Sequence, residues 1–326
     1  MAGNRLSIVA MSGSTATDHT RVPSRSARRR ELQAKFERLW LLDPEQFDPL
    51  RNCMERLRLE RSEALILKMT ALAGKKVVDL GCGAGVFACQ LRAAGATVDA
   101  VDIAENALKR LRDKKVDGIR TIQDAMPDTT LADGSYDLVV CTELIAELPS
   151  DDYRLFFSEL CRLVKSDGLV LFSTAVDIDS EGALERLMDL LQTEFDIIKI
   201  VASYHALHIR LKHLCERPAG YVQGGKEPEN RKRELSKRRA ISRWWYWLNT
   251  IPPLTWFWWP VSLMMKPLLQ LLRKNRALLL ACEKMAKCFG DESQISHLLF
   301  MAKRRPLVIE SAEQPVRKLG KKEIWE

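Results

Sequence analysis

Three alternating glycines, Gly81, Gly83 and Gly85, follow a short apolar run that contains Asp79 near its end. The run is typical of a buried parallel strand. Because glycine has no Cβ, alternating glycines allow a sharp turn and bring bare backbone against a ligand. The pattern at 86–94 predicts a helix. Strand, turn and helix together predict the first unit of a nucleotide-binding α/β domain.

A second acid, Asp102, ends the next predicted strand, 97–102, and stands 21 residues after Gly81. At this place a carboxylate can accept hydrogen bonds from both ribose hydroxyls of a nucleoside. The alternative interpretation is that Asp102 caps the helix predicted at 105–111. The spacing argues against a dinucleotide-binding dehydrogenase, because the third glycine of G-x-G-x-x-G would have to stand where the chain has Val86.

The pattern continues with three further predicted strands, at 119–122, 131–141 and 165–174. In this order the signals resemble the class I S-adenosylmethionine-dependent methyltransferases, whose motif I has the form seen at 79–85. The resemblance covers about residues 74–204 and also 296–304. It implies an α/β fold with a Rossmann-like seven-stranded sheet, and S-adenosyl-L-methionine as the cofactor.

The resemblance also implies a set of cofactor-binding residues. In this family the acid at the place of Asp124 commonly hydrogen-bonds the adenine amino group, and its neighbour packs on the ring. A loop acid that caps a turn is the alternative interpretation of Asp124. The implied cofactor-binding residues are Arg58, Asp79, Gly81, Gly83, Gly85, Asp102, Ile103, Asp124, Ala125, Cys141 and Thr142.

Residues 31–73 predict helices of the kind that cap the cofactor site in many methyltransferases. The segment 47–59 is similar to the approach segment of quinone-biosynthesis O-methyltransferases, in which an Arg contacts the cofactor's carboxylate. Arg58 is the residue at that place, with Arg51 second, and a solvated helix charge is the alternative for both.

Those quinone enzymes also carry E-x-x-E-H after the fourth strand, where this chain has Glu143, Ala146 and Glu147. The departure argues against a metal-assisted mechanism of that kind, and no metal is predicted.

A general base is needed only if the methyl acceptor is a hydroxyl or a protonated amine. Glu143, Glu147, His205 and His208 are the candidates. For each of them a solvated acid or a packed histidine is the alternative interpretation.

The composition, 46% hydrophobic and 29% charged over 326 residues, is that of a globular chain with one large domain and an extra element. The eight cysteines show no C-x-x-C spacing, so neither a zinc site nor a redox motif is suggested, and reduced thiols in a cytoplasmic protein are expected.

Residues 1–30 carry six arginines against one acid and predict a disordered basic tail. A mitochondrial transit peptide is the alternative.

The sixth strand, predicted at 195–204, and the seventh, predicted at 297–303, stand about 90 residues apart. Such a length exceeds an ordinary hairpin loop, so an inserted subdomain is predicted at 205–295, before the last strand and tail at 296–326. Because the sixth strand is parallel to the first, the insertion is expected to emerge at the ligand-binding edge of the sheet.

The insertion has the composition of a membrane-binding segment. Its basic residues at 231–243 are Arg231, Lys232, Arg233, Lys237, Arg238, Arg239 and Arg243, against the single acid Glu234. The next 22 residues, 244–265, carry no charge and hold six of the eight tryptophans. Tryptophan prefers the headgroup level, and each cation beside anionic lipid contributes about 1 kcal/mol before screening. We therefore predict that 231–289 binds a membrane surface.

Three prolines, Pro252, Pro253 and Pro260, argue against a membrane-spanning helix, since each costs about 3 kcal/mol in a helix interior. Further on, one predicted helical face holds Leu268, Leu271, Leu272, Leu278, Leu279, Cys282, Met285 and Phe289, and the other Arg273, Arg276, Glu283, Lys284 and Lys287. This predicts an amphipathic helix in the membrane plane. A spanning segment and a soluble lid or dimer interface stay open as alternatives. RNA binding fits the uncharged stretch less well.

The sequence thus favours a methyltransferase that acts at a membrane surface on a lipophilic, quinone- or lipid-like acceptor. It would be cytoplasmic and peripherally membrane-associated, or on the mitochondrial inner-membrane face. The alternatives are a methyltransferase acting on protein or nucleic acid, and a non-catalytic cofactor-binding membrane adaptor.

Overall fold

A computed structural model of the chain describes residues 24–176, 183–236, 240–289 and 294–305. The chain divides into two compact units. Unit 1 holds the described parts of Met1–Leu50, Glu55–Ser203 and Ile295–Glu326, and unit 2 holds Arg51–Met54 and those of Tyr204–Gln294.

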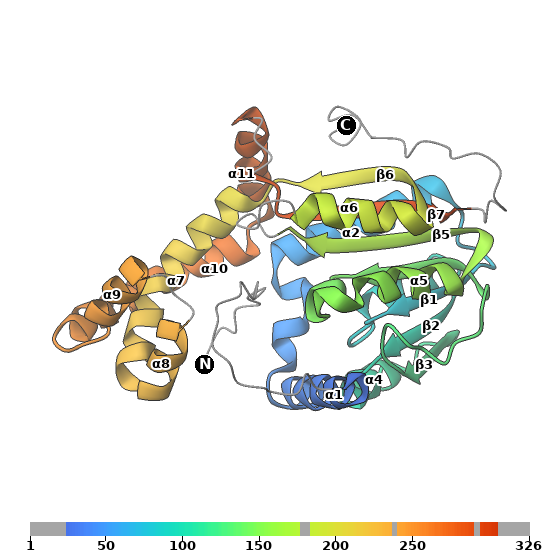
Figure 1. Ribbon diagram of the computed structural model, residues 1–326. Helices are drawn as coiled ribbons and strands as arrows, with labels where there is room; N and C mark the ends of the chain where they lie inside the picture. Colours follow the sequence, from blue (N-terminus) through green and yellow to red (C-terminus); the bar gives the residue numbers. More distant parts are fainter. Residues whose placement is uncertain (1–23, 177–182, 237–239, 290–293, 306–326) are drawn as a thin grey trace. The chain divides into compact units, whose positions relative to one another are not determined.

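Unit 1 is built on a seven-stranded sheet (Figure 1). The strands are β1 (Lys76–Leu80), β2 (Thr97–Asp102), β3 (Ile119–Gln123), β4 (Tyr136–Thr142), β5 (Val164–Ala175), β6 (Phe195–Ser203) and β7 (His297–Arg304). Their order in the sheet is β3-β2-β1-β4-β5-β7-β6, and β7 is antiparallel to both of its neighbours. This is the predicted Rossmann-like methyltransferase sheet, with the last strand inserted beside β5.

The helices of unit 1 precede the sheet or connect its strands. They are α1 (Arg25–Leu42), α2 (Cys53–Met69), α3 (Val86–Ala93), α4 (Glu105–Arg112), α5 (Tyr153–Leu163) and α6 (Ala183–Glu194), with short 3-10 turns η1 (Pro44–Phe47), η2 (Pro49–Arg51), η3 (Ile145–Glu147) and η4 (Ser150–Asp152). In the view of Figure 1, α5 and α6 lie in front of the sheet. The first two residues of α2, Cys53 and Met54, belong to unit 2.

The β-branched run of β1 forms the centre of the core. Val77 and Val78 are completely buried, and so are Val98 of β2 and Val140 of β4 on the neighbouring strands. Strands with both faces covered read as continuous apolar runs, which is why the sequence pattern located them well. The glycine turn therefore projects from a rigid, fully packed sheet.

One predicted boundary is wrong. Residues 25–30 lie in α1, inside the segment predicted as a disordered tail, and Ser24 caps this helix by accepting a hydrogen bond from the Ala27 N–H at 3.3 Å. An N-cap serine stabilises the first turn of a helix. The rest of the predicted tail, 1–23, lies outside the described residues.

Unit 2 consists of helices. They are α7 (Ala206–Lys226), α8 (Pro228–Ser236), α9 (Ala240–Asn249), α10 (Leu254–Lys274) and α11 (Arg276–Phe289). A Cβ at Gly225 of α7 would lie 2.4 Å from Thr255 Cγ2 of α10, so a glycine is needed where these helices approach closely. Lys237, Arg238 and Arg239 of the predicted basic segment lie outside the described residues.

The predicted amphipathic helix is wrong in its details. The segment forms two helices that meet at Asn275, and its apolar residues do not share one environment. Leu272 and Leu279 are buried within unit 2, whereas Met285 is 54% exposed. Glu283, predicted on the polar face, is buried.

The prolines do not break α10, which continues through Pro260 and Pro267. Packing along α7 offsets the hydrogen bonds that each proline removes. Within the described part of the chain, no helix combines the length and the apolar character needed to cross a membrane.

Candidate active site

The glycine turn lies where β1 ends and α3 begins. Gly81 and Gly83 have φ angles of +75° and +54°, which L side chains rarely adopt. A Cβ at Gly81 would lie 2.5 Å from the Leu144 side chain, and one at Gly83 would lie 2.9 Å from the Trp40 ring. The turn needs glycine both for its conformation and for the space beside it.

Asp102 holds this turn through both of its carboxylate oxygens. Oδ2 accepts the Gly83 N–H at 2.8 Å, and Oδ1 accepts the Ala104 N–H at 2.9 Å. Burial raises the pKa of Asp102, and these two hydrogen bonds offset part of that rise. Since a carboxylate has about four acceptor positions, two remain for a ligand.

The alternative interpretation, in which Asp102 caps α4, is wrong. The N-cap residue of α4 is Ala104, whose side chain makes no capping bond. Instead, the Glu37 carboxylate of α1 accepts the N–H groups of Glu105 and Asn106 at 2.7 and 3.1 Å. A negative charge at this position also complements the helix dipole.

Asp79 is buried directly below the turn. Its Oδ2 has no hydrogen-bond partner among the residues that the structure describes. Burial, with the Asp102 charge as the second cause, raises the pKa of Asp79 to about 7. A buried oxygen without a partner marks a place where a ligand or water would be accommodated.

Asp124, the predicted adenine contact, already has four hydrogen-bond donors. Oδ1 accepts Arg29 at 2.7 Å and the Ala125 N–H at 2.8 Å, while Oδ2 accepts the N–H and the hydroxyl of Thr130 at 2.6 and 2.8 Å. Burial acts to raise the pKa of Asp124, but these hydrogen bonds, those of Thr130 first, outweigh it and lower the pKa. Asp124 therefore makes the turn-capping hydrogen bonds that the alternative interpretation predicts.

Helix α1 places side chains beside the glycine turn and Asp102, which together form the cradle. Sequence reasoning missed these side chains. Trp40 is buried beside Gly83 and stacks on Phe47, with ring centroids 4.6 Å apart. Ile103, a predicted cofactor contact, packs on the same cluster. Arg29 of the same helix reaches Asp124, 95 residues further along the chain. No local sequence signal connects residues so distant in the chain.

A second polar cluster lies at the ends of β4, β5 and β7. Arg58 of α2 pairs with Glu55 at 2.6 Å and with Glu143 Oε1 at 2.9 Å. The Ser173 hydroxyl donates to the same Glu143 oxygen at 3.0 Å. Arg58 Nε is buried and has no hydrogen-bond partner in the described residues, so this guanidinium can still bind an anionic group.

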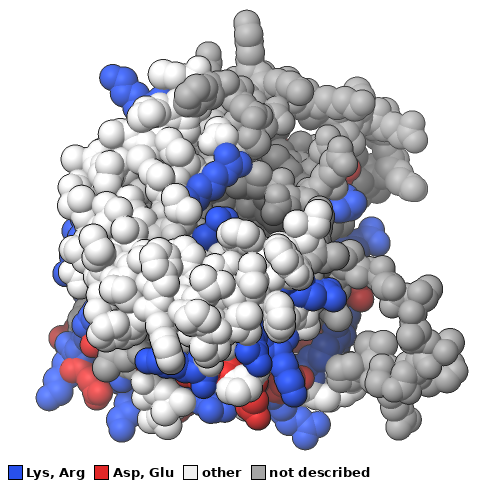
Figure 2. Space-filling view, turned by 90° about the vertical axis from the view of Figure 1, so that its left-hand side faces the viewer, with Lys and Arg blue, Asp and Glu red and all other residues white. Residues whose placement is uncertain are grey.

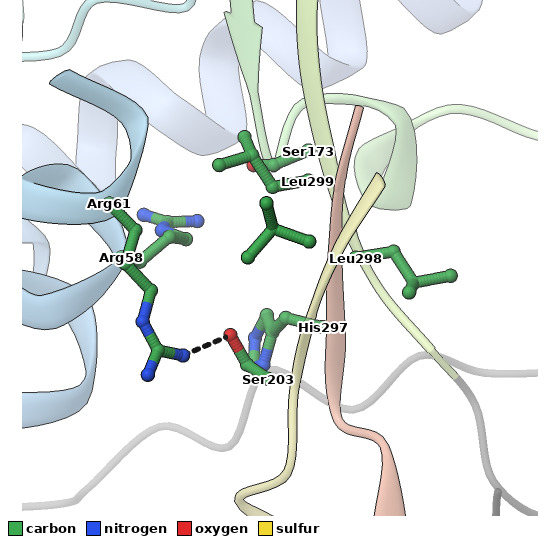
Figure 3. Close-up of a pocket in the computed structure, with 8 residues that line it drawn as sticks. Arg58, Arg61, Ser173, Ser203, His297, Leu298 and Leu299 are labelled. Carbon is green, nitrogen blue, oxygen red and sulfur yellow. Dashed lines mark hydrogen bonds between the residues drawn. The ribbon is translucent and has the colours of Figure 1, made fainter. Parts of the chain in front are cut away.

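A small pocket opens beside this cluster (Figure 3). Its lining residues are Arg58, Arg61, Ser173, Val201, Ser203, His297, Leu298 and Leu299. Arg61 donates to the Ser203 hydroxyl at 3.0 Å, the dashed contact in Figure 3.

The remaining predicted cofactor-binding and general-base residues have separate surroundings. Cys141 and Thr142 are the last two residues of β4, with Cys141 buried opposite Leu80. Glu147 pairs with Lys35 at 2.6 Å. Arg51, the second arginine candidate, belongs to unit 2.

The two histidine candidates are packed inside unit 2. His205 Nε2 lies 3.8 Å from the buried Glu283 carboxylate, and His208 shares a 2.9 Å hydrogen bond with the Leu272 carbonyl. Burial lowers the pKa of His208. No cluster of three or more side chains suited to a metal ion was found in the described segments.

These groups fit the chemistry of S-adenosylmethionine. The glycine turn offers bare backbone, Asp102 has acceptor positions left, and Asp79 has a buried oxygen without a partner in the described residues. The incompletely bonded Arg58 offers donors to a carboxylate.

Comparison with known proteins agrees with this geometry. Residues 78–172 match the family model of the methyltransferase domain. The ubiquinone biosynthesis O-methyltransferases of Bordetella avium and Thiobacillus denitrificans are 36% and 34% identical to this chain over 149 and 148 residues. These matches cover 44% and 43% of this chain and 58% and 61% of the relatives, so the chain spans less than two thirds of their length.

Among solved structures, the N-methyltransferase NodS of Bradyrhizobium japonicum, in complex with S-adenosyl-L-homocysteine, is similar with a TM-score of 0.44 at 19% identity. The match covers 52% of this chain and 89% of NodS. Residues 78–172 of this chain are therefore similar to a methyltransferase domain.

Proposed function

We propose that this chain transfers the methyl group of S-adenosylmethionine to a hydroxyl of a lipophilic, quinone-like acceptor at a membrane surface. The observation that carries the proposal is the glycine cradle tied to Asp102, inside the segment that matches the methyltransferase domain. The names of the related proteins support oxygen as the acceptor atom and a ubiquinone precursor as the type of acceptor.

Different residues would bind different parts of the cofactor. The two remaining acceptor positions of Asp102 would take the ribose hydroxyls. Arg58 would bind the carboxylate through its unpartnered buried donor. Asp124 can take the adenine amino group only if one of its four present donors gives way, and Arg29 is the side chain among them that reaches in from another element.

The cofactor supplies an electrophilic methyl group on a sulfonium. Because transfer is a direct displacement, much of the rate comes from holding the acceptor oxygen in line with the methyl–sulfur bond. The rigid edge formed by β1, β4 and β5 is suited to that task.

Membrane action is supported by the surface of unit 2. Trp244, Trp256 and Trp259 are 59%, 74% and 54% exposed, as are other large apolar side chains nearby in sequence. Figure 2 shows a broad face that is mostly without charge, with a few lysines or arginines in its upper part and more of them, together with some acidic residues, along its lower border. Exposed large apolar side chains on a face with little charge are typical of an interaction site, and the tryptophans with flanking cations favour anionic lipid.

Labelled S-adenosylmethionine and a total lipid extract test the proposal. We expect label in a chloroform-soluble product that resists mild alkali, as a phenolic methyl ether would. Label confined to protein or RNA would instead favour the alternative acceptors. Cofactor binding with no transfer to any fraction would favour the non-catalytic adaptor.

A further inference from the structure

Glu143 is held in an unfavourable backbone conformation at the edge of the sheet. Its φ angle is +61°, which is uncommon for a residue with a side chain. The Glu143 N–H donates to the Ser173 carbonyl at 3.0 Å, and this bond helps to hold the residue in place. Such strain persists only where the surroundings over-determine it, and it clusters at functional sites.

The strained residue aims its carboxylate at His297, the first residue of β7. Glu143 Oε1 is engaged by Arg58 and Ser173, while Oε2 lies 3.8 Å from His297 Nε2. The His297 side chain is 14% exposed and borders the pocket of Figure 3. The imidazole is therefore accessible from the pocket and has a carboxylate beside it.

Hydrogen bonds on the other side of the ring set its tautomer. The Ser296 hydroxyl donates its hydrogen to the Ser203 carbonyl at 3.0 Å. It can then only accept from His297 Nδ1, which lies 3.0 Å from the Ser296 oxygen. With the ring proton on Nδ1, the Nε2 atom of the neutral ring carries the lone pair.

The lining of the pocket beside His297 combines apolar and polar groups. Val201 and Leu299 supply apolar contact, and Arg61 and Ser203 supply polar atoms at the rim. Register places His297 opposite Ala175 of β5 and Ser203 of β6, at the sheet edge that also carries the glycine turn.

We propose that His297 is the general base of methyl transfer and that Glu143 is its positioning residue. This inference rests on the proposed function and names the residue that accepts the proton. As the acceptor oxygen forms its bond to the methyl carbon, His297 Nε2 takes the hydroxyl proton. The methyl–sulfur bond breaks with its electron pair left on sulfur, which gives the methyl ether, S-adenosylhomocysteine and an imidazolium. The Glu143 carboxylate, paired with Arg58 on its other oxygen, stabilises that imidazolium.

The test uses the full chain with S-adenosylhomocysteine and 4-nitrocatechol, whose absorbance changes when its phenol ionises. In the wild-type protein we expect the pKa of the bound phenol to fall by about one unit or more, because the imidazolium beside it stabilises the phenolate. His297→Gln should return this pKa close to that of the free probe, and Glu143→Gln should weaken the shift. His213→Gln, an exposed histidine of α7, is the matched control and should keep it.

Turnover supplies a second readout. His297→Gln should lose at least about tenfold in kcat on catechol, with a much smaller loss on 4-nitrocatechol, which is already ionised at neutral pH. Retention of the spectral shift by His297→Gln, or equal losses on both probes, would overturn the assignment. So would a wild-type protein that binds the cofactor but neither shifts nor methylates either probe. Failure to bind S-adenosylhomocysteine would instead contradict the proposed function itself.

Discussion

Gly83 and Gly134 have the same φ angle of +54°, but a Cβ would meet another side chain only at Gly83. Replacing either by alanine should cost about 1–2 kcal/mol of unfolding free energy, because both backbones are left-handed. Only Gly83→Ala should also weaken S-adenosylmethionine binding, since its Cβ presses on Trp40 in the cradle. Urea unfolding and calorimetric titration of both variants check this. Equal cofactor affinities in the two variants would contradict a role of the turn in binding.

Asp79 gives the fold a predictable dependence on pH. Its pKa is raised to about 7 in the folded chain, above the 3.8 of an ordinary aspartate, so the folded state binds more protons than the unfolded state between these values. The free energy of unfolding should therefore fall as pH rises from about 4 to about 7, by at most about 4 kcal/mol.

Asp79→Asn should remove much of this slope and be more stable than the wild type at pH 8. Asp113→Asn, at an exposed position after α4, is the control and should keep the wild-type slope. Urea unfolding across this pH range measures both, and a wild-type profile in Asp79→Asn would rule out Asp79 as the cause.

The residues of the cradle could be predicted from the sequence because the glycine motif and its spacing to Asp102 lie within one short stretch of the chain. Sequence reasoning placed Gly81, Gly83 and Asp102 at the turn where the structure has them. It missed Glu37 at the start of α4 because that cap comes from 68 residues away. The Glu143–His297 contact was likewise hidden, since it depends on β7 lying beside β5.

At the scale of elements, we propose that Arg29 of α1 and the adenine of the cofactor compete for Asp124. All four acceptor positions of Asp124 are filled, one of them by Arg29 of α1. Arg29→Gln should free a position for the adenine amino group and tighten S-adenosylmethionine binding several-fold. Its effect on stability should be at most about 1 kcal/mol, because Arg29 is 46% exposed.

Arg30→Gln, the adjacent exposed position, provides the control and should leave the dissociation constant unchanged. Calorimetric titration measures both variants. Weaker binding by Arg29→Gln would mean that this arginine supports the cofactor site and does not compete for it.

The strands were predictable from sequence and the helices of unit 2 were less so. Strands such as β2 are short apolar runs between turn residues, and the predicted bounds of β2 agree with the structure. Helix α10 continues through Pro260, one of the three prolines that argued against a membrane-spanning helix in this segment. The sequence shows where a proline removes a helical hydrogen bond. It does not show the packing of α10 along α7, which offsets that cost.

For the whole molecule, we propose that unit 2 adds membrane binding to the segment that matches a methyltransferase domain. In liposome flotation we expect the full chain to float with anionic vesicles and to float less with zwitterionic ones, since cations contribute about 1 kcal/mol each near anionic lipid. Trp256→Ser should reduce the bound fraction through lost apolar burial, by about tenfold in affinity.

Leu41→Ser, an exposed apolar position of unit 1, is the matched control and should float as the wild type does. Equal flotation of Trp256→Ser and Leu41→Ser would contradict the assignment of the tryptophans to the lipid surface. Retention on RNA without flotation would favour the nucleic-acid alternative.

The most direct test of the central claim is calorimetric titration of the full chain with S-adenosylmethionine. We expect one cofactor per chain and a loss of at least about tenfold in affinity for Asp102→Ala, which removes both the proposed ribose acceptor and a hydrogen bond to the Gly83 N–H. The exposed Asp117→Ala should bind as the wild type does, and circular dichroism should show all three proteins folded. No binding by the wild type, or an unchanged dissociation constant in Asp102→Ala, would show that the glycine turn and Asp102 do not form the cofactor site.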